Sequence, residues 1–307
     1  MYKEHESKRL KSNLTLLITA AIWGFAFVAQ KDASKNVSAF AFNGIRFIIG
    51  ALSLIPVICI FEKKYFFNRE KLVSTIKCGA IAGTVLFAAS FFQQKGVEAL
   101  EQASSAGFIT GLYTVLVPLI GLVFGKKPSI NAAVGAVFAV AGLYFTCMSE
   151  TLHFETGDLL LLAGSFFWAF HIIVIDSFIK RINPVTFSSV QFLTCGLINI
   201  ILCIVFEADT FSLQNVFAAA VPILYAGIMS CAIAYTLQVI GQKNARPTEA
   251  SIILSTESVF GCIGCMLILG ERLSLRSLFG CILIFAGIVV SQLKFKRDGR
   301  CEPTPKS

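Results

Sequence analysis

Ten stretches of this chain are each long and apolar enough to cross a lipid bilayer as a helix, and they constrain the fold more than any other feature. About 20 mostly apolar residues span the hydrocarbon core, where a helix satisfies its own backbone polar groups. The stretches are 14–30, 39–61, 72–92, 103–124, 131–148, 159–178, 185–206, 216–241, 249–270 and 275–293. We therefore predict an all-α polytopic membrane protein with ten transmembrane helices.

Composition agrees with this fold class. The 307 residues are 56% hydrophobic and 14% charged, with a mean hydropathy of +0.76. An ordinary soluble domain carries about a quarter charged residues. The lipid bilayer is thus the first predicted partner, and no long stretch remains for a soluble domain.

The net charge of +8 follows the predicted topology. The two ends of the chain and the loops after the even-numbered helices hold 19 Lys and Arg, whereas the loops after the odd-numbered helices hold 5, counting Arg276 at the start of the last helix. Positively charged loops stay on the cytoplasmic side. The pattern predicts cytoplasmic termini in a multi-pass protein of the cell (plasma or inner) membrane, and it indicates no nucleic-acid partner.

No chemistry-bearing motif points to an enzyme. The sequence has no HExxH, GxSxG or Walker motif, and no dinucleotide-binding loop in a strand–helix context. Most of the ten cysteines lie within apolar stretches, where a thiol packs as a small hydrophobe. We expect no catalytic residues, no metal site and no cofactor.

The chain contains an internal repeat with a shift of 145 residues. The shift aligns Trp23 with Trp168 and Gln93 with Gln238, together with a series of glycines in the same order. Each half holds five predicted helices, an odd number, so the second copy must enter the membrane from the opposite side. Inverted repeats of this kind are typical of secondary transporters.

The repeat gives the expected domain organisation. We expect a cytoplasmic N-terminal segment at 1–13, a first five-helix repeat at 14–148, a second at 157–293, and a cytoplasmic tail at 294–307.

The sequence also resembles the drug/metabolite transporter superfamily, specifically its EamA-type ten-helix transporters. The resemblance rests on "AAIWGFAFVAQK" in the first helix, "GIRF" in the second, "STESVFG" and "GERLS" in and after the ninth, and Gly280 with Gly287 in the tenth. It implies a permease for small metabolites, often amino acids or related compounds, working by alternating access. Ser258 departs from the family pattern, because proline is frequent there and would support a kink.

Glu257 is the main candidate for a functional ionisable group, since it lies in an otherwise apolar, small or hydroxylic run. On a helix it shares a stripe with Ala250, Gly261 and Gly264, so it is expected to face the interior of the protein. Two interpretations stay open. The carboxyl either fixes helix packing through hydrogen bonds, or it takes part in substrate binding or proton coupling.

Two further ionisable residues lie inside predicted helices. Arg46 comes near the depth of Glu257, and it either anchors the structure or binds a carboxylate of the substrate. An ion pair between Arg46 and Glu257 is one possibility that the sequence leaves open. His171 is either a hydrogen-bonded packing residue or a participant in proton coupling.

Aromatic and polar side chains share helix faces in a pattern typical of small-molecule pockets. Each face could equally belong to the core, but Trp and Gln recur at equivalent positions of the two halves. The candidate binding residues of this kind are Trp23, Trp168, Gln93, Gln238, Tyr113, Tyr235, Ser90 and Thr110.

Taken together, the sequence predicts a secondary-active exporter of small metabolites, with Glu257 as the candidate proton site. Two other classes remain as alternatives: an uncoupled facilitator or channel, and a membrane-embedded lipid-handling protein.

Overall fold

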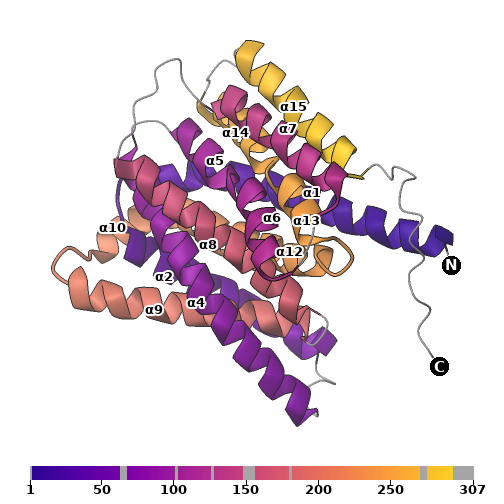
Figure 1. The fold of residues 1–307 in the computed structure, drawn as a ribbon. Helices are drawn as coiled ribbons and strands as arrows, with labels where there is room; N and C mark the ends of the chain where they lie inside the picture. The colour runs from indigo at the N-terminus through magenta and orange to yellow at the C-terminus, as the bar shows by residue number, and fades with distance from the viewer. Residues whose placement is uncertain are drawn as a thin grey trace.

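All regular structure in the described part of the chain is helical (Figure 1). The computed structural model describes residues 2–62, 68–100, 103–125, 128–147, 156–179, 182–269 and 275–292. In the first half the helices are α1 (Tyr2–Ala33), α2 (Ala39–Ser53), α3 (Ile55–Val57), the π-helical η1 (Ile58–Glu62), α4 (Arg69–Ala99), α5 (Ala103–Gly111), α6 (Tyr113–Val123) and α7 (Ile130–Cys147). In the second half they are α8 (Thr156–Phe178), α9 (Pro184–Phe206), α10 (Leu213–Ala218), α11 (Ala220–Leu224), the π-helical η3 (Tyr225–Tyr235), α12 (Thr236–Gly241), α13 (Pro247–Leu254), α14 (Glu257–Leu269) and α15 (Leu275–Gln292).

Seven helical stretches among the described residues are long and apolar enough to cross a membrane. They are Lys8–Ala33, Ala39–Glu62, Arg69–Ala99, Thr156–Phe178, Pro184–Phe206, Ala220–Gly241 and Pro247–Ile268. Three shorter apolar helices accompany them, at Ile109–Val123, Ile130–Phe145 and Leu278–Ser291. The prediction of an all-helical polytopic membrane protein is confirmed.

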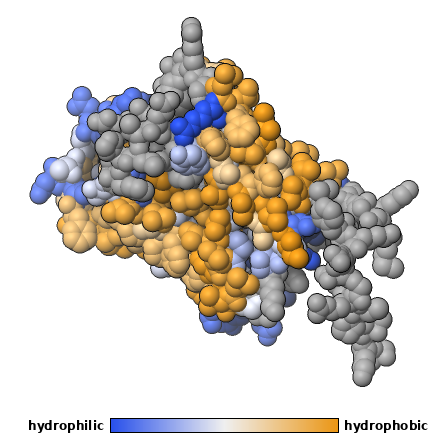
Figure 2. Space-filling view, turned by 45° about the horizontal axis from the view of Figure 1, so that its top comes forward, coloured by the Kyte–Doolittle hydropathy of each residue, from blue (hydrophilic) through white to orange (hydrophobic). Residues whose placement is uncertain are grey.

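Large apolar side chains cover much of the outer surface, as expected for a protein surrounded by lipid. Phe61, Val123 and Leu275 are 74%, 84% and 86% exposed. Figure 2 shows apolar residues over most of the visible face, with hydrophilic residues gathered toward its margins. This surface would be unstable in water, where large exposed apolar patches promote association.

Two of the predicted transmembrane helices are interrupted at equivalent positions of the repeat. The stretch 103–124 is broken at Leu112, between α5 and α6, and the stretch 249–270 is broken at Ser255 and Thr256, between α13 and α14. Leu112 is the position that the 145-residue shift aligns with Glu257. The sequence offered no proline next to Glu257 to predict the second break.

Hydroxyl side chains explain the break between α13 and α14. Ser251, Ser255 and Thr256 donate their hydroxyls to the carbonyl oxygens of Thr248, Ile252 and Ile253, at 2.9, 2.7 and 2.7 Å. Such bonds compete with the backbone ladder and bend helices. In the first half, Pro118 lies inside α6 and removes the backbone bond to Thr114, one turn earlier.

The eighth predicted helix is also irregular. It is built from α11, η3 and α12, and the 11 residues of η3 adopt a π-helix. π-Helical turns are rare and are often found at functional sites. The widened turn presents the Ser230 carbonyl oxygen to Trp23 Nε1, at 3.3 Å.

The last helices of the two halves, α7 and α15, pack side by side through glycines (Figure 1). A Cβ on Gly135 would lie 2.6 Å from the Gly287 carbonyl oxygen, and one on Gly142 would lie 2.6 Å from that of Gly280. Under the 145-residue shift, Gly135 corresponds to Gly280 and Gly142 to Gly287. The contact therefore maps onto itself when the two halves are exchanged.

A second pair of contacts repeats in the same way. Gly96 of α4 packs against Leu161 of α8, and its equivalent, Gly241 of α12, packs against Leu16 of α1. Leu16 and Leu161 are themselves 145 residues apart.

The equivalent helices α1 and α8 run in opposite directions. Both make contacts with the C-terminal part of α4: Gln30, near the end of α1, bonds to Gln93, while Gly157, at the start of α8, touches the backbone of Gly96. The C-terminal end of α1 therefore lies level with the N-terminal end of α8.

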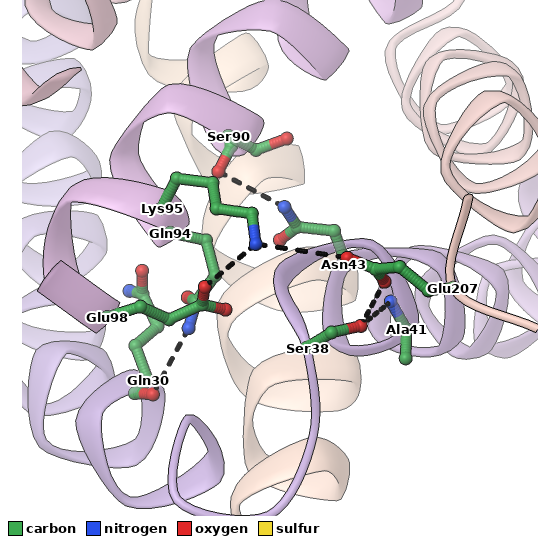
Figure 3. A network of polar contacts seen from close by, with 9 residues as sticks. All are labelled: Gln30, Ser38, Ala41, Asn43, Ser90, Gln94, Lys95, Glu98 and Glu207. Carbon is green, nitrogen blue, oxygen red and sulfur yellow. Dashed lines mark hydrogen bonds and ion pairs between the residues drawn. The ribbon is translucent and has the colours of Figure 1, made fainter. Parts of the chain in front are cut away.

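Separate polar contacts join the helices at each end of the bundle. At what we name the Lys95 end, Lys95 lies 3.2 Å from Glu98 and 3.8 Å from Glu207, which also accepts a hydrogen bond from Ser38 (Figure 3). At the opposite Arg9 end, Arg9 pairs with Glu249 at 3.2 Å. These contacts join α1 to α13 at one end, and α2, α4 and α9 at the other.

The Glu62 carboxylate caps the first turn of α9 at the Arg9 end. It accepts hydrogen bonds from the backbone amides of Val185 and Thr186, at 3.1 and 2.9 Å. A negative group at a helix N-terminus satisfies amides that have no partner within the helix.

Candidate functional site

A small cavity lies at the centre of the bundle, where the interrupted helices meet the π-helical η3. Its volume is about 30 Å³, room for about two water molecules. It is lined by Trp23, Ala26, Phe27, Gln30, Arg46, Gln93, Thr110, Tyr113, Trp168, Ile172, Ser230, Tyr235, Gln238, Leu254 and Glu257. Nine of the eleven residues that the sequence singled out are in this lining.

Three aromatic rings form one side of the cavity. Trp23 of α1 lies 4.6 Å from Tyr235 of η3 between ring centroids, and Trp168 of α8 lies 6.4 and 6.0 Å from these two rings. The two tryptophans are equivalent in the repeat. Their direct contact places the boundary between the halves inside the cavity.

A chain of hydrogen bonds links both halves along the cavity wall. Trp168 Nε1 donates to Gln93 Oε1 at 2.6 Å, and Gln93 Nε2 donates to Gln30 Oε1 at 2.9 Å. Gln94 Nε2 also donates to the Gln30 carbonyl oxygen, at 3.3 Å (Figure 3). Gln93 is therefore held by partners on both sides.

Gln30 is a lining residue that the sequence analysis did not select. The signal was present, because Gln30 follows Trp23 by seven residues and so lies on the same helix face. It lacked the recurrence that favoured the Trp and Gln candidates, because its equivalent in the second half is Ile175.

Glu257 is the first residue of α14 and is 4% exposed. Tyr113, the first residue of α6, donates its hydroxyl to Glu257 Oε1 at 3.2 Å. Thr114 of α6 donates to the carbonyl oxygen of Ser251 on α13, and Ser258 of α14 donates to that of Gly107 on α5. The two interrupted helices therefore cross at their breaks, and the carboxyl lies at the crossing.

Arg46, on α2, is 2% exposed and lines the same cavity as Glu257. No carboxylate lies within ion-pair distance of its guanidinium among the described residues, and its Nε has no hydrogen-bond partner there. The cation lies 4.9 and 4.7 Å from the ring centroids of Phe42 and Phe47. The structure thus answers the question that the sequence left open, because Arg46 and Glu257 do not pair.

Two other polar side chains of the lining also lack partners. Gln238 Oε1 and Thr110 Oγ1 are buried and accept or donate no hydrogen bond among the described residues. Gln238 differs in this from its repeat equivalent, Gln93. Buried polar atoms are nearly always hydrogen-bonded, so these groups and Arg46 are suited to bind a polar molecule.

His171 and Ser90 lie outside the cavity lining. His171 Nε2 lies 3.0 Å from Gln191 Oε1, and its ring packs at 6.0 Å from Trp168 and 6.3 Å from Tyr235. Ser90 donates its hydroxyl to the Phe87 carbonyl oxygen, and its own carbonyl oxygen accepts a bond from Asn43 (Figure 3). Both residues support the wall from behind.

Larger hollows lie toward each end of the molecule. One of about 390 Å³ lies at the Arg9 end, between α6, α7, α8 and the residues Lys243 to Thr248. Another, of about 330 Å³, lies at the Lys95 end, beside Ser38 and Glu98. Partial burial lowers the pKa of the Lys243 ammonium, which lines the first hollow. The much smaller central cavity lies between these two openings.

Known proteins share this architecture. The chain is 30% identical to an uncharacterized transporter of Archaeoglobus fulgidus over 288 residues, covering 94% of this chain and 87% of that one. It is 20% identical to the uncharacterized transporter YoaV of Bacillus subtilis, covering 94% and 99%. A crystal structure that is 17% identical superposes with a TM-score of 0.73, covering 92% and 96% of the two chains, and so has the same fold.

The family assignment follows from both halves of the sequence. Residues 10–148 and 155–292 each match the EamA-like transporter family, which agrees with the two repeats predicted from the 145-residue shift. The protein is therefore a multi-pass membrane transporter that belongs to the EamA-like transporter family of the drug/metabolite transporter superfamily.

Proposed function

We propose that this transporter is a secondary-active exporter in the cell membrane that carries small metabolites, such as amino acids or related compounds, in exchange for protons. The central cavity binds the substrate, and the two halves of the chain alternate in exposing it to either side. The repeats at 14–148 and 157–293 are inverted, ten helices cross the membrane, and both termini, with the segments 1–13 and 294–307, are cytoplasmic.

The repeated contacts support the inverted arrangement. The α7–α15 glycine contact maps onto itself when the halves are exchanged, and α1 and α8 are oppositely directed although they are equivalent. Interrupted helices at corresponding positions of two halves are a recognised location of transport sites. The breaks at Leu112 and at Ser255–Thr256 have this relation.

The single observation that carries the proposal is the position of Glu257 at the crossing of the two broken helices. Its carboxyl lines the cavity, and Tyr113 is its only hydrogen-bond partner among the described residues. An ionisable group buried in a membrane protein without a counter-charge is costly. Protonation or a cationic group of the substrate would relieve this cost, so the two compete for one carboxylate.

This competition is the physical basis of exchange. A proton that binds to Glu257 releases the cationic group of the substrate, and the binding of that group releases the proton. His171 is not needed as a direct carrier, because it lies behind the Trp168 and Tyr235 rings.

The test uses the full-length protein in proteoliposomes. A panel of metabolites is first screened by counterflow, which requires a carrier cycle, and flux driven by a pH gradient is then measured for the accepted compounds. We expect Glu257→Gln to abolish the pH-driven flux while counterflow continues. Glu70→Gln, the same change at an exposed residue of α4, should leave both unchanged.

Three outcomes would contradict the proposal in different ways. Wild-type pH-driven flux in Glu257→Gln would exclude the carboxyl as the proton site. Fluxes of the wild type without saturable counterflow would indicate a channel or facilitator. No flux for any soluble metabolite, together with movement of lipid between leaflets, would favour the lipid-handling alternative.

A further inference from the structure

Among the described lining residues, the Arg46 guanidinium is the one charged group that the proposed proton exchange does not use. It is buried, permanently charged and without an ion-pair partner among the described residues. Arginine cannot become neutral in a protein, so Arg46 cannot escape its desolvation by losing a proton. Either the protein tolerates a lone charge, or a negative group arrives from outside.

The surroundings of Arg46 compensate for only part of this cost. Phe42 and Phe47 present their rings to the guanidinium, and such cation–π contacts stabilise a charge without using its N–H groups. The Nε–H of Arg46 has no hydrogen-bond partner among the described residues and is therefore available to a ligand.

The other charges of the cavity limit what that partner can be. Arg46 is the only cation among the described lining residues, and Glu257 is the only acidic residue. A doubly charged phosphate would find one positive charge and would be repelled by a carboxylate across the same small space. A carboxylate carries a single negative charge and matches the guanidinium fork through two parallel hydrogen bonds.

We propose that Arg46 is the carboxylate-binding residue of the transport site, and that substrates are small monocarboxylates whose carbon skeleton packs against Trp23, Trp168 and Tyr235. This assignment rests on the proposed function and adds a rule of specificity to it. A free carboxylate is needed for tight binding, and replacing it by an amide or removing it weakens binding. An ammonium group on the same molecule would face Glu257, where the proton also binds.

The free polar atoms near Arg46 fit this assignment. Gln238 Oε1 and Thr110 Oγ1 line the cavity without hydrogen-bond partners among the described residues, whereas Gln93 and Gln30 bond to each other. The Thr110 hydroxyl can therefore donate to a carboxylate held by Arg46, and Gln238 Oε1 can accept from an ammonium group of the same ligand.

The test measures ligand-induced shifts in the melting temperature of the purified full-length protein. The probes are leucine and phenylalanine, each compared with its amide, its decarboxylated amine and its deaminated acid. We expect the amino acids and deaminated acids to stabilise the wild type, and the amides and amines to bind at least tenfold more weakly.

The matched variants are Arg46→Met, Arg46→Lys and Lys77→Met. Arg46→Met should lose the acid-induced shift, and Arg46→Lys, which keeps the charge without the planar fork, should weaken it at least tenfold. Lys77→Met removes a positive charge from an exposed position of α4 and should behave as the wild type. In the absence of probes, the melting temperature of Arg46→Met should be no lower than that of the wild type, because the substitution removes an unpaired buried charge.

Several results would overturn the assignment. Three of them concern binding: equal binding of amides and acids, wild-type affinity for acids in Arg46→Met, or no binding of any acid to the wild type. The fourth is unfolding of both Arg46 variants, which would indicate that Arg46 has a structural role. The two proposals fail separately. Acid binding without counterflow would leave the Arg46 site standing and refute transport, whereas counterflow of amides or amines that survives Arg46→Met would refute only the Arg46 site.

Discussion

Two equivalent glutamines of this transporter have different surroundings at the scale of single residues. Gln93 and Gln238 lie 145 positions apart and line the same cavity, at 7% and 1% exposure. Gln93 is fixed between Trp168 and Gln30, whereas the side-chain oxygen of Gln238 has no hydrogen-bond partner among the described residues. The repeat thus supplies the same side chain twice, in two different hydrogen-bonding environments.

This difference predicts opposite effects of the same substitution. Gln93→Leu should lower the free energy of unfolding by about 1–3 kcal/mol, because it leaves the Trp168 indole N–H and the Gln30 amide buried and unpaired. Gln238→Leu should leave stability near that of the wild type and weaken substrate binding. Thermal denaturation of both variants, with counterflow of an accepted metabolite, distinguishes the two effects. Equal losses of stability would show that Gln238 is also a structural residue.

At the scale of helices, the packing of α1 against α14 determines where Glu257 lies. A Cβ on Gly24 of α1 would lie 2.4 Å from Phe260 Cβ and 2.6 Å from the Glu257 carbonyl oxygen. On the other side of the same contact, a Cβ on Gly261 would have its nearest neighbour at 3.6 Å, the Gly24 carbonyl oxygen. Small residues let the helix backbones approach closely. A Cβ would clash with its neighbours at Gly24 but not at Gly261.

We therefore expect Gly24→Ala and Gly261→Ala to differ. Gly24→Ala should destabilise the protein by about 1–3 kcal/mol, as overpacking usually does, because the atoms it meets include backbone that cannot rotate away. It should also reduce transport, since α14 carries Glu257. Gly261→Ala is the matched control and should be tolerated. The melting temperatures of the two variants provide the comparison, and a larger loss for Gly261→Ala would contradict this account.

At the scale of the whole molecule, polar contacts join helices at both ends of the bundle. Lys95 bridges toward Glu98 and Glu207 at one end (Figure 3), while Arg9 holds Glu249 at the other. An alternating transporter must release one set of contacts while the other remains closed. The central cavity of about 30 Å³ agrees with a state in which both ends hold.

Removing either set should shift the protein toward the corresponding open state. In a variant without native cysteines, a cysteine at Gln238 reports access to the cavity through its reaction with a membrane-impermeant thiol reagent. Lys95→Gln should increase labelling from outside the cell, and Arg9→Gln should increase labelling from the cytoplasmic side. These pairs are partly buried, and a change of about 1 kcal/mol alters an equilibrium between two states about fivefold, so severalfold changes in labelling rate are expected. A shift in the same direction for both variants would be inconsistent with opposite gates.

The sequence by itself determined the class of fold and most of the cavity lining. Long apolar stretches admit only membrane helices, because lipid cannot hydrogen-bond to the backbone. The recurrence of Trp and Gln at a fixed shift identified Trp23, Trp168, Gln93 and Gln238 before any coordinate was known. These signals depend on residue type and spacing, which a sequence records completely.

Only the tertiary structure decided how those residues are paired. It separated Arg46 from Glu257, placed Tyr113 against Glu257, joined His171 to Gln191, and broke the helices at Leu112 and at Ser255–Thr256. Hydrophobic periodicity identifies which face of a helix is buried, but it contains no information on which helix lies opposite. A hydrogen bond depends on distances of a few tenths of an ångström between distant segments, and these distances are set by the packing of the whole bundle.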